Sequence, residues 1–184
     1  MKNSFESLSD PFGDFITDGV FELWAEFLTM PNNSLSPPYR PDLLKSDALD
    51  FSVDSLHHVD DYLGFVRKTI PRDDDLATVC MQCGSYVGEV IRRASPPGSC
   101  RWVSFAAAMP HGPGAEPDPV GPHNFARLLC GKASSYPFGK VLKRLKDGEE
   151  HNVWAFATMV IQLNNLPEGR FEAFLRNLKS GSPK

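Results

Sequence analysis

The sequence contains no long uncharged apolar run and no excess of basic residues. Its longest nearly uncharged apolar segment runs from Val153 to Leu163. This is shorter than the roughly 20 residues that cross a bilayer as a helix. The formal net charge is −4, which argues against nucleic-acid binding because the phosphate backbone attracts a basic face. We therefore expect neither a membrane protein nor a nucleic-acid binder.

Cysteine is scarce, with four residues in 184. The N-terminal stretch MKNSFESLSDPFGDF lacks the basic region and apolar run that mark a secretory signal. We therefore expect a cytoplasmic chain in which the four cysteines are reduced thiols rather than a disulfide frame. The length fits one globular domain over residues 1–184.

Common catalytic motifs are also missing. The sequence has no Gly-rich phosphate loop, no G-x-S-x-G elbow and no H-E-x-x-H pair. Its histidines and cysteines do not follow the spacing of a zinc ribbon or of a di-metal bundle. We therefore predict no metal, no cofactor and, more plausibly than an enzyme, a protein without catalytic activity.

Apolar residues recur at helical spacing through most of the chain and predict five or six helices. The predicted ranges are 9–29, 52–68, 73–94, 137–147, 147–165 and 167–178. The apolar stripe expected to bury the first helix comprises Phe12, Phe15, Ile16, Val20, Leu23, Phe27 and Leu28. In the helix over 147–165, Asp147 and Glu150 have capping-box spacing.

Two segments break the helical pattern. Residues 31–49 are rich in proline and serine and predict an extended connection, with one short helical turn. Residues 95–123 are rich in proline and glycine and predict a hairpin with a long loop, its strands at 101–109 and 123–130. Residues 179–184 form a polar tail. The fold class is therefore α+β: a mostly helical domain with one small antiparallel hairpin.

The helix over 73–94 contains QCGSY, which resembles the box around the nucleophilic cysteine of papain-like proteases. A papain-type cysteine begins its helix, whereas the apolar periodicity places Cys83 in the middle of one, on its core face. The position six residues earlier, where that family carries glutamine, is Ala77. We therefore favour a packed core cysteine. The alternative is a small hydrolase or metal-binding protein that uses Cys83 with His111, His123 or His151.

The same helix carries glycines and charges beside its apolar stripe. Gly84 and Gly88 lie one turn apart, and two helical glycines favour close approach of another part of the chain. Glu89 lies one turn before Arg92 and Arg93, which predicts a surface ion pair. The alternative is a buried structural network in which Glu89, Arg93 and Arg101 meet where the helix joins the hairpin.

Three segments, GSYVGEVIRR, RW and PFGKVLKRLKDGEEHNVWAF, resemble a set of uncharacterised bacterial proteins. Those proteins share a G-x-Y-x-G-E-x-x-R-R helix, a nearby tryptophan and a P-F-x-K-V-x-K-R-L-x-x-G-E-E segment. The resemblance covers the C-terminal two-thirds of the chain. Small acidic proteins of this kind include immunity proteins, so the resemblance implies binding to a cognate toxin.

The leading functional hypothesis is therefore a non-enzymatic binding protein with one cognate protein partner. A homodimer is also compatible with the sequence. We expect the contact surface to combine the 110–122 loop with the 140–151 segment. Its residues would be His111, Glu116, Asp118, Lys140, Lys143, Arg144, Glu149 and Glu150.

Overall fold

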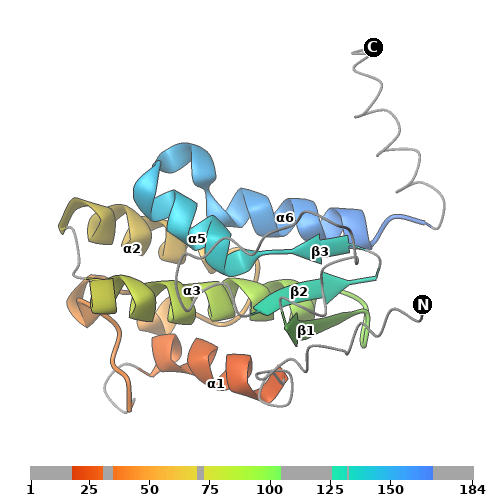
Figure 1. The fold of residues 1–184 in the computed structure, drawn as a ribbon, viewed down its shortest axis with the longest axis horizontal. Helices are drawn as coiled ribbons and strands as arrows, with labels where there is room; N and C mark the ends of the chain where they lie inside the picture. The colour runs from red at the N-terminus through yellow and green to blue at the C-terminus, as the bar shows by residue number, and fades with distance from the viewer. Residues whose placement is uncertain (1–17, 31–34, 70–72, 105–125, 132, 168–184) are drawn as a thin grey trace, which may run out of the picture.

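The structure is a computed structural model that describes residues 18–30, 35–69, 73–104, 126–131 and 133–167. These residues form five α-helices and one three-stranded antiparallel sheet (Figure 1). The helices are α1 (Asp18–Thr29), α2 (Leu56–Thr69), α3 (Asp73–Ala94), α5 (Pro137–Lys146) and α6 (Val153–Asn164). The strands are β1 (Cys100–Ser104), β2 (Ala126–Cys130) and β3 (Ala133–Ser135). The α+β, mostly helical fold class is confirmed.

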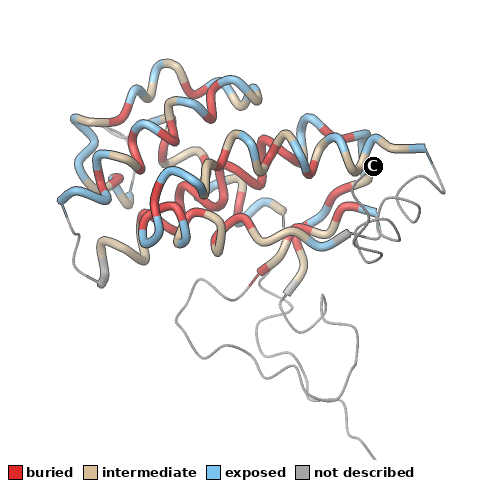
Figure 2. The backbone as a smooth tube through the Cα atoms, turned by 90° about the horizontal axis from the view of Figure 1, so that it is seen from above, coloured by how far each residue is buried: buried red, intermediate tan, exposed pale blue. Residues whose placement is uncertain are grey.

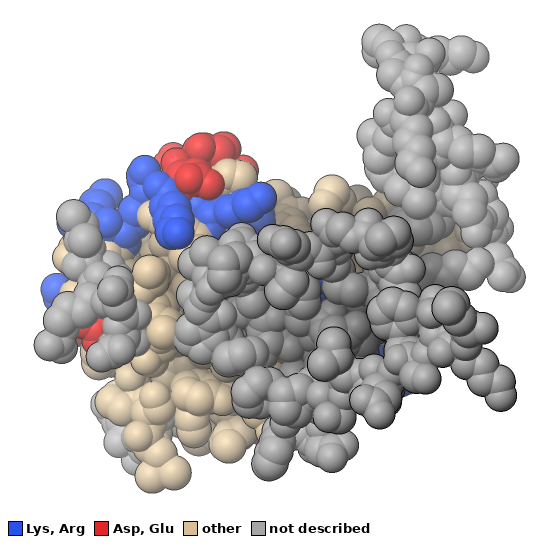
Figure 3. Space-filling model, viewed as in Figure 1, with Lys and Arg blue, Asp and Glu red and all other residues tan. Residues whose placement is uncertain are grey.

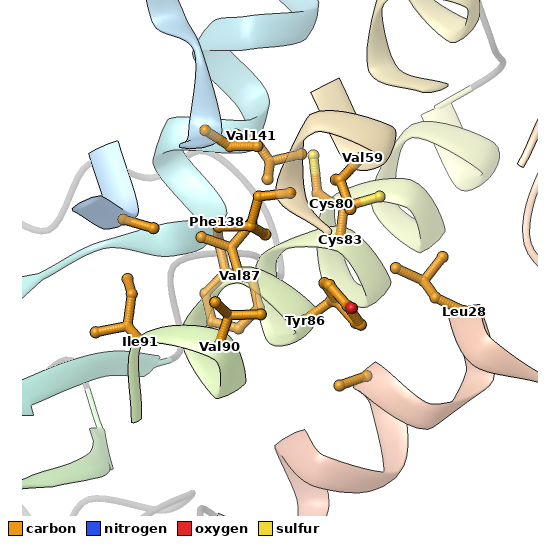
Figure 4. Close-up of a cluster of buried hydrophobic side chains, with 14 of the residues drawn as sticks. Leu28, Val59, Cys80, Cys83, Tyr86, Val87, Val90, Ile91, Phe138 and Val141 are labelled. Atoms are coloured by element: carbon orange, nitrogen blue, oxygen red, sulfur yellow. The ribbon is translucent and has the colours of Figure 1, made fainter. Parts of the chain in front are cut away.

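Helix α3 runs through the middle of the molecule, with α1 on one side and α2, α5 and α6 on the other (Figure 1). Every residue from Val79 to Ile91 except Met81 is buried. Figure 2 shows buried residues in the surrounding elements as well. Figure 4 shows Cys83, Val87 and Val90 of α3 among the apolar side chains that the other helices contribute. Helix α3 therefore organises the core.

The two glycines of α3 lie where aromatic side chains press against the helix. A Cβ added to Gly84 would lie 2.3 Å from Cδ1 of Phe138, on α5. A Cβ added to Gly88 would lie 2.2 Å from Cζ2 of Trp102, on β1. Both positions require glycine because a side chain there would overlap a ring, which explains why α3 tolerates two residues of low helix propensity.

Helix α1 differs from its predicted form. The structure describes it from Asp18, so residues 9–17 of the predicted helix lie outside the described part. It packs on α3 through Phe21, Ala25 and Leu28. The predicted stripe is wrong for Val20 and Leu23, which are 40% and 52% exposed. Helix α1 is apolar on two faces, and spacing alone does not identify the face that packs.

The remaining helix boundaries show smaller differences. The connection over 31–49 contains two 3-10 turns, η2 (Pro41–Leu43) and η3 (Ser46–Ala48). The helix expected over 147–165 is divided into the turn η5 (Glu149–His151) and α6. Its cap is Asn152, whose Oδ1 accepts a hydrogen bond from the Ala155 N–H at 2.7 Å, and not the Asp147 capping box. The predicted helix over 167–178 lies outside the described residues.

The sheet contains the expected pairing and one further strand. Strands β1 and β2 pair antiparallel with Trp102 opposite Leu128, and β3 pairs with the other edge of β2. Cys100 and Cys130 face each other in this register and form a disulfide. The expectation of four reduced thiols is therefore wrong for these two cysteines, because strand pairing brings together residues that are far apart in the sequence.

Candidate functional site

The 140–151 segment forms a charged surface at one end of the molecule. We call Lys140, Lys143, Lys146, Asp147, Glu149 and Glu150 the α5–η5 surface, and all except the half-buried Lys140 are exposed. Figure 3 shows basic and acidic side chains next to one another over this end of the protein. The surface therefore presents both signs of charge within a stretch of about three helical turns.

Lys140 is more buried than Lys143 and Lys146. Its Nζ lies 5.9 Å from the centroid of the Phe156 ring, within the range of a cation–π contact. Partial burial lowers the pKa of Lys140, and the neighbouring charge of Lys143 acts in the same direction, while Asp60 opposes it.

Arg144 does not belong to the exposed surface that the sequence predicts. The structure buries it to 6% exposure. Its Nε lies 3.4 Å from Oδ1 of Asp60 on α2, and its Nη2 donates to the Asp60 carbonyl at 3.3 Å. The predicted role of Arg144 in contacting a partner is therefore corrected: it faces the core because α5 turns this residue toward α2.

Asp60 connects three helices. Besides Arg144, its carboxylate accepts hydrogen bonds from the N–H groups of Val153 at 2.9 Å and Trp154 at 3.1 Å, in the first turn of α6. These N–H groups have no partner within the helix, and the helix N-terminus favours negative charge. Asp60 and Arg144 thus form a buried polar pair that links α2 to α5 and to the first turn of α6. We call this pair the clamp.

The structure does not describe the loop half of the predicted contact surface. His111, Glu116 and Asp118, as well as His123, fall outside the described residues. His151 lies beside the α5–η5 surface, with its Nε2 3.3 Å from Oδ2 of Asp147. The structure therefore locates only the helical half of the predicted contact surface.

A second polar cluster surrounds Glu89 of α3, whose side chain is fully buried. Arg92 donates to both carboxylate oxygens, with its Nη2 2.7 Å from Oε2. The Trp102 indole N–H donates to Oε1 at 2.9 Å. Arg93 lies 3.6 Å from Oε2 and donates to Glu22 at 2.8 Å. Glu89 is thus a buried charge with several partners, as such groups require.

This cluster contains Glu89 and Arg93 of the predicted network but not Arg101. In a strand, successive side chains point to opposite faces. Because Trp102 faces α3, Arg101 points away and is exposed. The main-chain N–H of Trp102 also donates to Asp18 at 2.9 Å. The cluster therefore ties α1, α3 and β1 together.

Cys83 has the environment of a core residue. It is fully buried, and burial raises its thiol pKa well above the ordinary value, with a smaller contribution from Cys80. Burial also raises the pKa of Cys80 to about 12. Figure 4 shows both residues directed from α3 into the apolar interior. A nucleophilic cysteine needs a lowered pKa and access to substrate, and neither thiol has these properties.

The described part of the chain contains no group of three or more His, Cys, Asp or Glu side chains placed to hold a metal ion. None of its helices combines the length and apolar character needed to cross a membrane. The carboxylates of Asp60 and Glu89 already accept hydrogen bonds from other groups of this chain. Among the described residues, these two carboxylates therefore serve to position helices and a strand.

Comparison with known proteins gives no relative. No family model matches the sequence, no curated protein matches it, and no solved structure matches its fold.

Sequence reasoning missed Asp60 and Trp102 as members of the two polar clusters. Asp60 lies in the stretch HHVDDY and looks like one carboxylate of a solvated helix face. One signal was present: Asp60 follows Leu56 at four residues and precedes Leu63 at three, which places it on the apolar side of α2. The spacing of Asp61 is different, and it is exposed.

Proposed function

We propose that this protein is a non-enzymatic binding protein whose α5–η5 surface contacts one cognate protein. The observation that carries the proposal is the buried Asp60–Arg144 clamp directly beneath that surface. The clamp joins the helices on both sides of η5 to α2, so the charged segment is held in one geometry. A surface ordered before binding loses less conformational freedom when the complex forms.

The clamp has an energetic cost that this role would explain. A buried ion pair is often no more stabilising than apolar residues of similar size. Asp60 and Arg144 could be replaced by such residues if packing were their only task. Instead, the Asp60 carboxylate accepts hydrogen bonds from the first turn of α6, and Arg144 Nη2 donates to the Asp60 carbonyl, so α6 and α5 are both tied to α2. Fixed charges contribute to the specificity and the rate of association more than to affinity alone.

The charge pattern favours a protein partner over a nucleic acid. Lys143 and Lys146 lie beside Asp147, Glu149 and Glu150, so the surface has no uniform positive potential. A nucleic-acid backbone would be repelled by the carboxylates. A protein with an interleaved pattern of opposite charges would complement the surface.

A more specific proposal concerns the kind of partner that this protein binds and the cellular compartment in which it acts. The resemblance of the GSYVGEVIRR and PFGKVLKRLKDGEE segments to bacterial proteins supports an immunity protein that neutralises a cognate toxin. The sequence alone predicts a cytoplasmic location for such a protein. The Cys100–Cys130 disulfide argues against that location, since structural disulfides persist mainly in oxidising compartments. Alkylating the free thiols of the protein inside its own cells, and then counting the alkylated cysteines, would show whether Cys100 and Cys130 are reduced or disulfide-bonded there.

Capture from cell extract tests the contact surface. We would tag the wild-type protein and a Lys143→Glu variant, and identify what remains bound after a high-salt wash. The matched control is Lys45→Glu, the same change at another exposed lysine, next to η3 and outside the α5–η5 surface. We expect one partner in near-equal amount with wild type and Lys45→Glu, and at least about tenfold less with Lys143→Glu.

Two outcomes would contradict the proposal. Equal capture by Lys143→Glu and by wild type would place the contact surface elsewhere on the protein. Recovery of no partner from cells grown under several conditions would argue against a dedicated binding protein. In that case, metal analysis and thiol reactivity would become the next measurements.

A further inference from the structure

The disulfide lies at a defined point of the sheet. Cys100 and Cys130 are directly opposite each other on β1 and β2, with Cα atoms 4.1 Å apart. Next to them, the Gly131 N–H donates to the Ser99 carbonyl at 2.9 Å. The cysteines therefore occupy a non-hydrogen-bonded position, where the two strands approach most closely. The cross-link replaces the backbone hydrogen bonds that this position lacks.

The disulfide also contacts the end of α6. Asn164 is the last residue of that helix, and its Nδ2 donates to the Ser99 hydroxyl at 2.9 Å. The same Nδ2 lies 3.5 Å from Sγ of Cys100. Cys100 and Cys130 are 5% and 2% exposed, and the adjacent Gly131 is exposed, so the cross-link lies just below the protein surface.

Trp102 lies two residues beyond Cys100 on the same face of β1. Its indole donates to the buried Glu89, and its main-chain N–H donates to Asp18. Its ring packs 4.3 Å from that of Phe21, measured between centroids. Strand β1 is an edge strand whose only described sheet neighbour is β2. The covalent bond to β2 is therefore close to the residue that completes the Glu89 cluster.

We propose that the Cys100–Cys130 disulfide is a redox-dependent cross-link that keeps the Trp102 indole hydrogen-bonded to Glu89. In the oxidised form, β1 cannot separate from β2 near Cys100, and Glu89 keeps its indole partner. In the reduced form, the two thiols allow the edge strand to move away. Water then replaces the indole at the carboxylate.

The chemical step is thiol–disulfide exchange with a dithiol reductant. A thiolate of the reductant attacks one sulfur of the disulfide, the S–S bond breaks and a mixed disulfide forms. The second thiolate of the reductant displaces the remaining protein sulfur. The protein gains two electrons and two protons as Cys100 and Cys130 thiols, and the reductant leaves as its own disulfide. Cys80 and Cys83 stay thiols in both forms.

Hydrogen exchange at the Trp102 indole tests this coupling. Indole N–H exchange would be followed by NMR in the air-oxidised protein and after treatment with dithiothreitol, with Trp102 assigned from a Trp102→Phe variant. We expect exchange at Trp102 to become at least about tenfold faster on reduction, because the hydrogen bond to Glu89 then opens more often. Exchange at Trp154, on α6, should change little.

A Cys100→Ala, Cys130→Ala variant provides the second arm. Its Trp102 indole should exchange as fast as in the reduced protein, with or without dithiothreitol. The proposal would be overturned if reduction left Trp102 exchange in the wild type unchanged. It would also be overturned if reduction removed the helical circular-dichroism signal, since the cross-link would then support the whole fold. Four titratable thiols in the unfolded, air-oxidised chain would overturn it as well.

Discussion

Replacing Gly88 by alanine gives the most direct test of how β1 packs on α3. An alanine Cβ would lie 2.2 Å from Cζ2 and 2.4 Å from Cη2 of Trp102. Carbon atoms in contact lie about 3.5–4.0 Å apart. The indole would therefore have to move by more than about 1 Å. It has little room to do so, because it packs on Phe21 and donates to Glu89.

The expected magnitude follows from three contributions. Overpacking of a core costs about 1–3 kcal/mol. Loss of a hydrogen bond to a charged group costs about 1.5–3 kcal/mol. Alanine returns about 1 kcal/mol through its higher helix propensity. We therefore expect Gly88→Ala to lower the free energy of unfolding by about 2 kcal/mol or more.

Urea unfolding followed by circular dichroism would measure this change. The matched control is Gly64→Ala on α2, where the nearest heavy atom to the new Cβ is Nη2 of Arg144 at 3.4 Å. The control should be neutral or stabilising by up to about 1 kcal/mol. In a Trp102→Leu background, Gly88→Ala should cost less than it does alone. A Gly88→Ala variant as stable as wild type would refute the packing of Trp102 on α3.

Two further predictions concern buried polar groups. Asp60→Asn should lower the free energy of unfolding by about 3–5 kcal/mol, because it leaves the buried Arg144 charge without its partner; the exposed Asp61→Asn is the control, and equal effects of the two would contradict the clamp. The native thiols of Cys80 and Cys83 should not react with Ellman's reagent at pH 8, and both should react after unfolding. Burial raises both pKa values above 9.0, the ordinary cysteine value, so unfolding allows the thiols to ionise. Stability should accordingly fall as pH rises above about 9, and rapid native labelling would contradict this environment.

The sequence was informative where one helix determines the environment of its own residues. The apolar stripe from Leu76 to Ile91 predicts the core face of α3, and the structure buries its members from Val79 onward. The spacing of Gly84 and Gly88 predicts close approach of another segment, and Phe138 and Trp102 occupy those places. Such features depend on a period of 3.6 residues, which is visible in a single sequence.

Features that depend on two distant segments could not be read in the same way. The clamp joins α2 to α5 and α6, and the disulfide joins strands whose cysteines are 30 residues apart. Neither Asp60 nor Arg144 differs by residue type from its solvated neighbours. The buried face of α1 was also misjudged, because Val20 and Leu23 repeat at helical spacing as regularly as Phe21, Ala25 and Leu28. In each case tertiary packing decides which of several equivalent patterns is buried.

Native mass spectrometry of the protein isolated from its own cells tests the central claim most directly. A dedicated binding protein predicts a complex whose mass equals this chain plus one other protein in equal copy number. The complex should persist through a high-salt wash and disappear with Lys143→Glu. A single species of this chain carrying a metal ion or small molecule in stoichiometric amount, with no protein partner, would contradict the account.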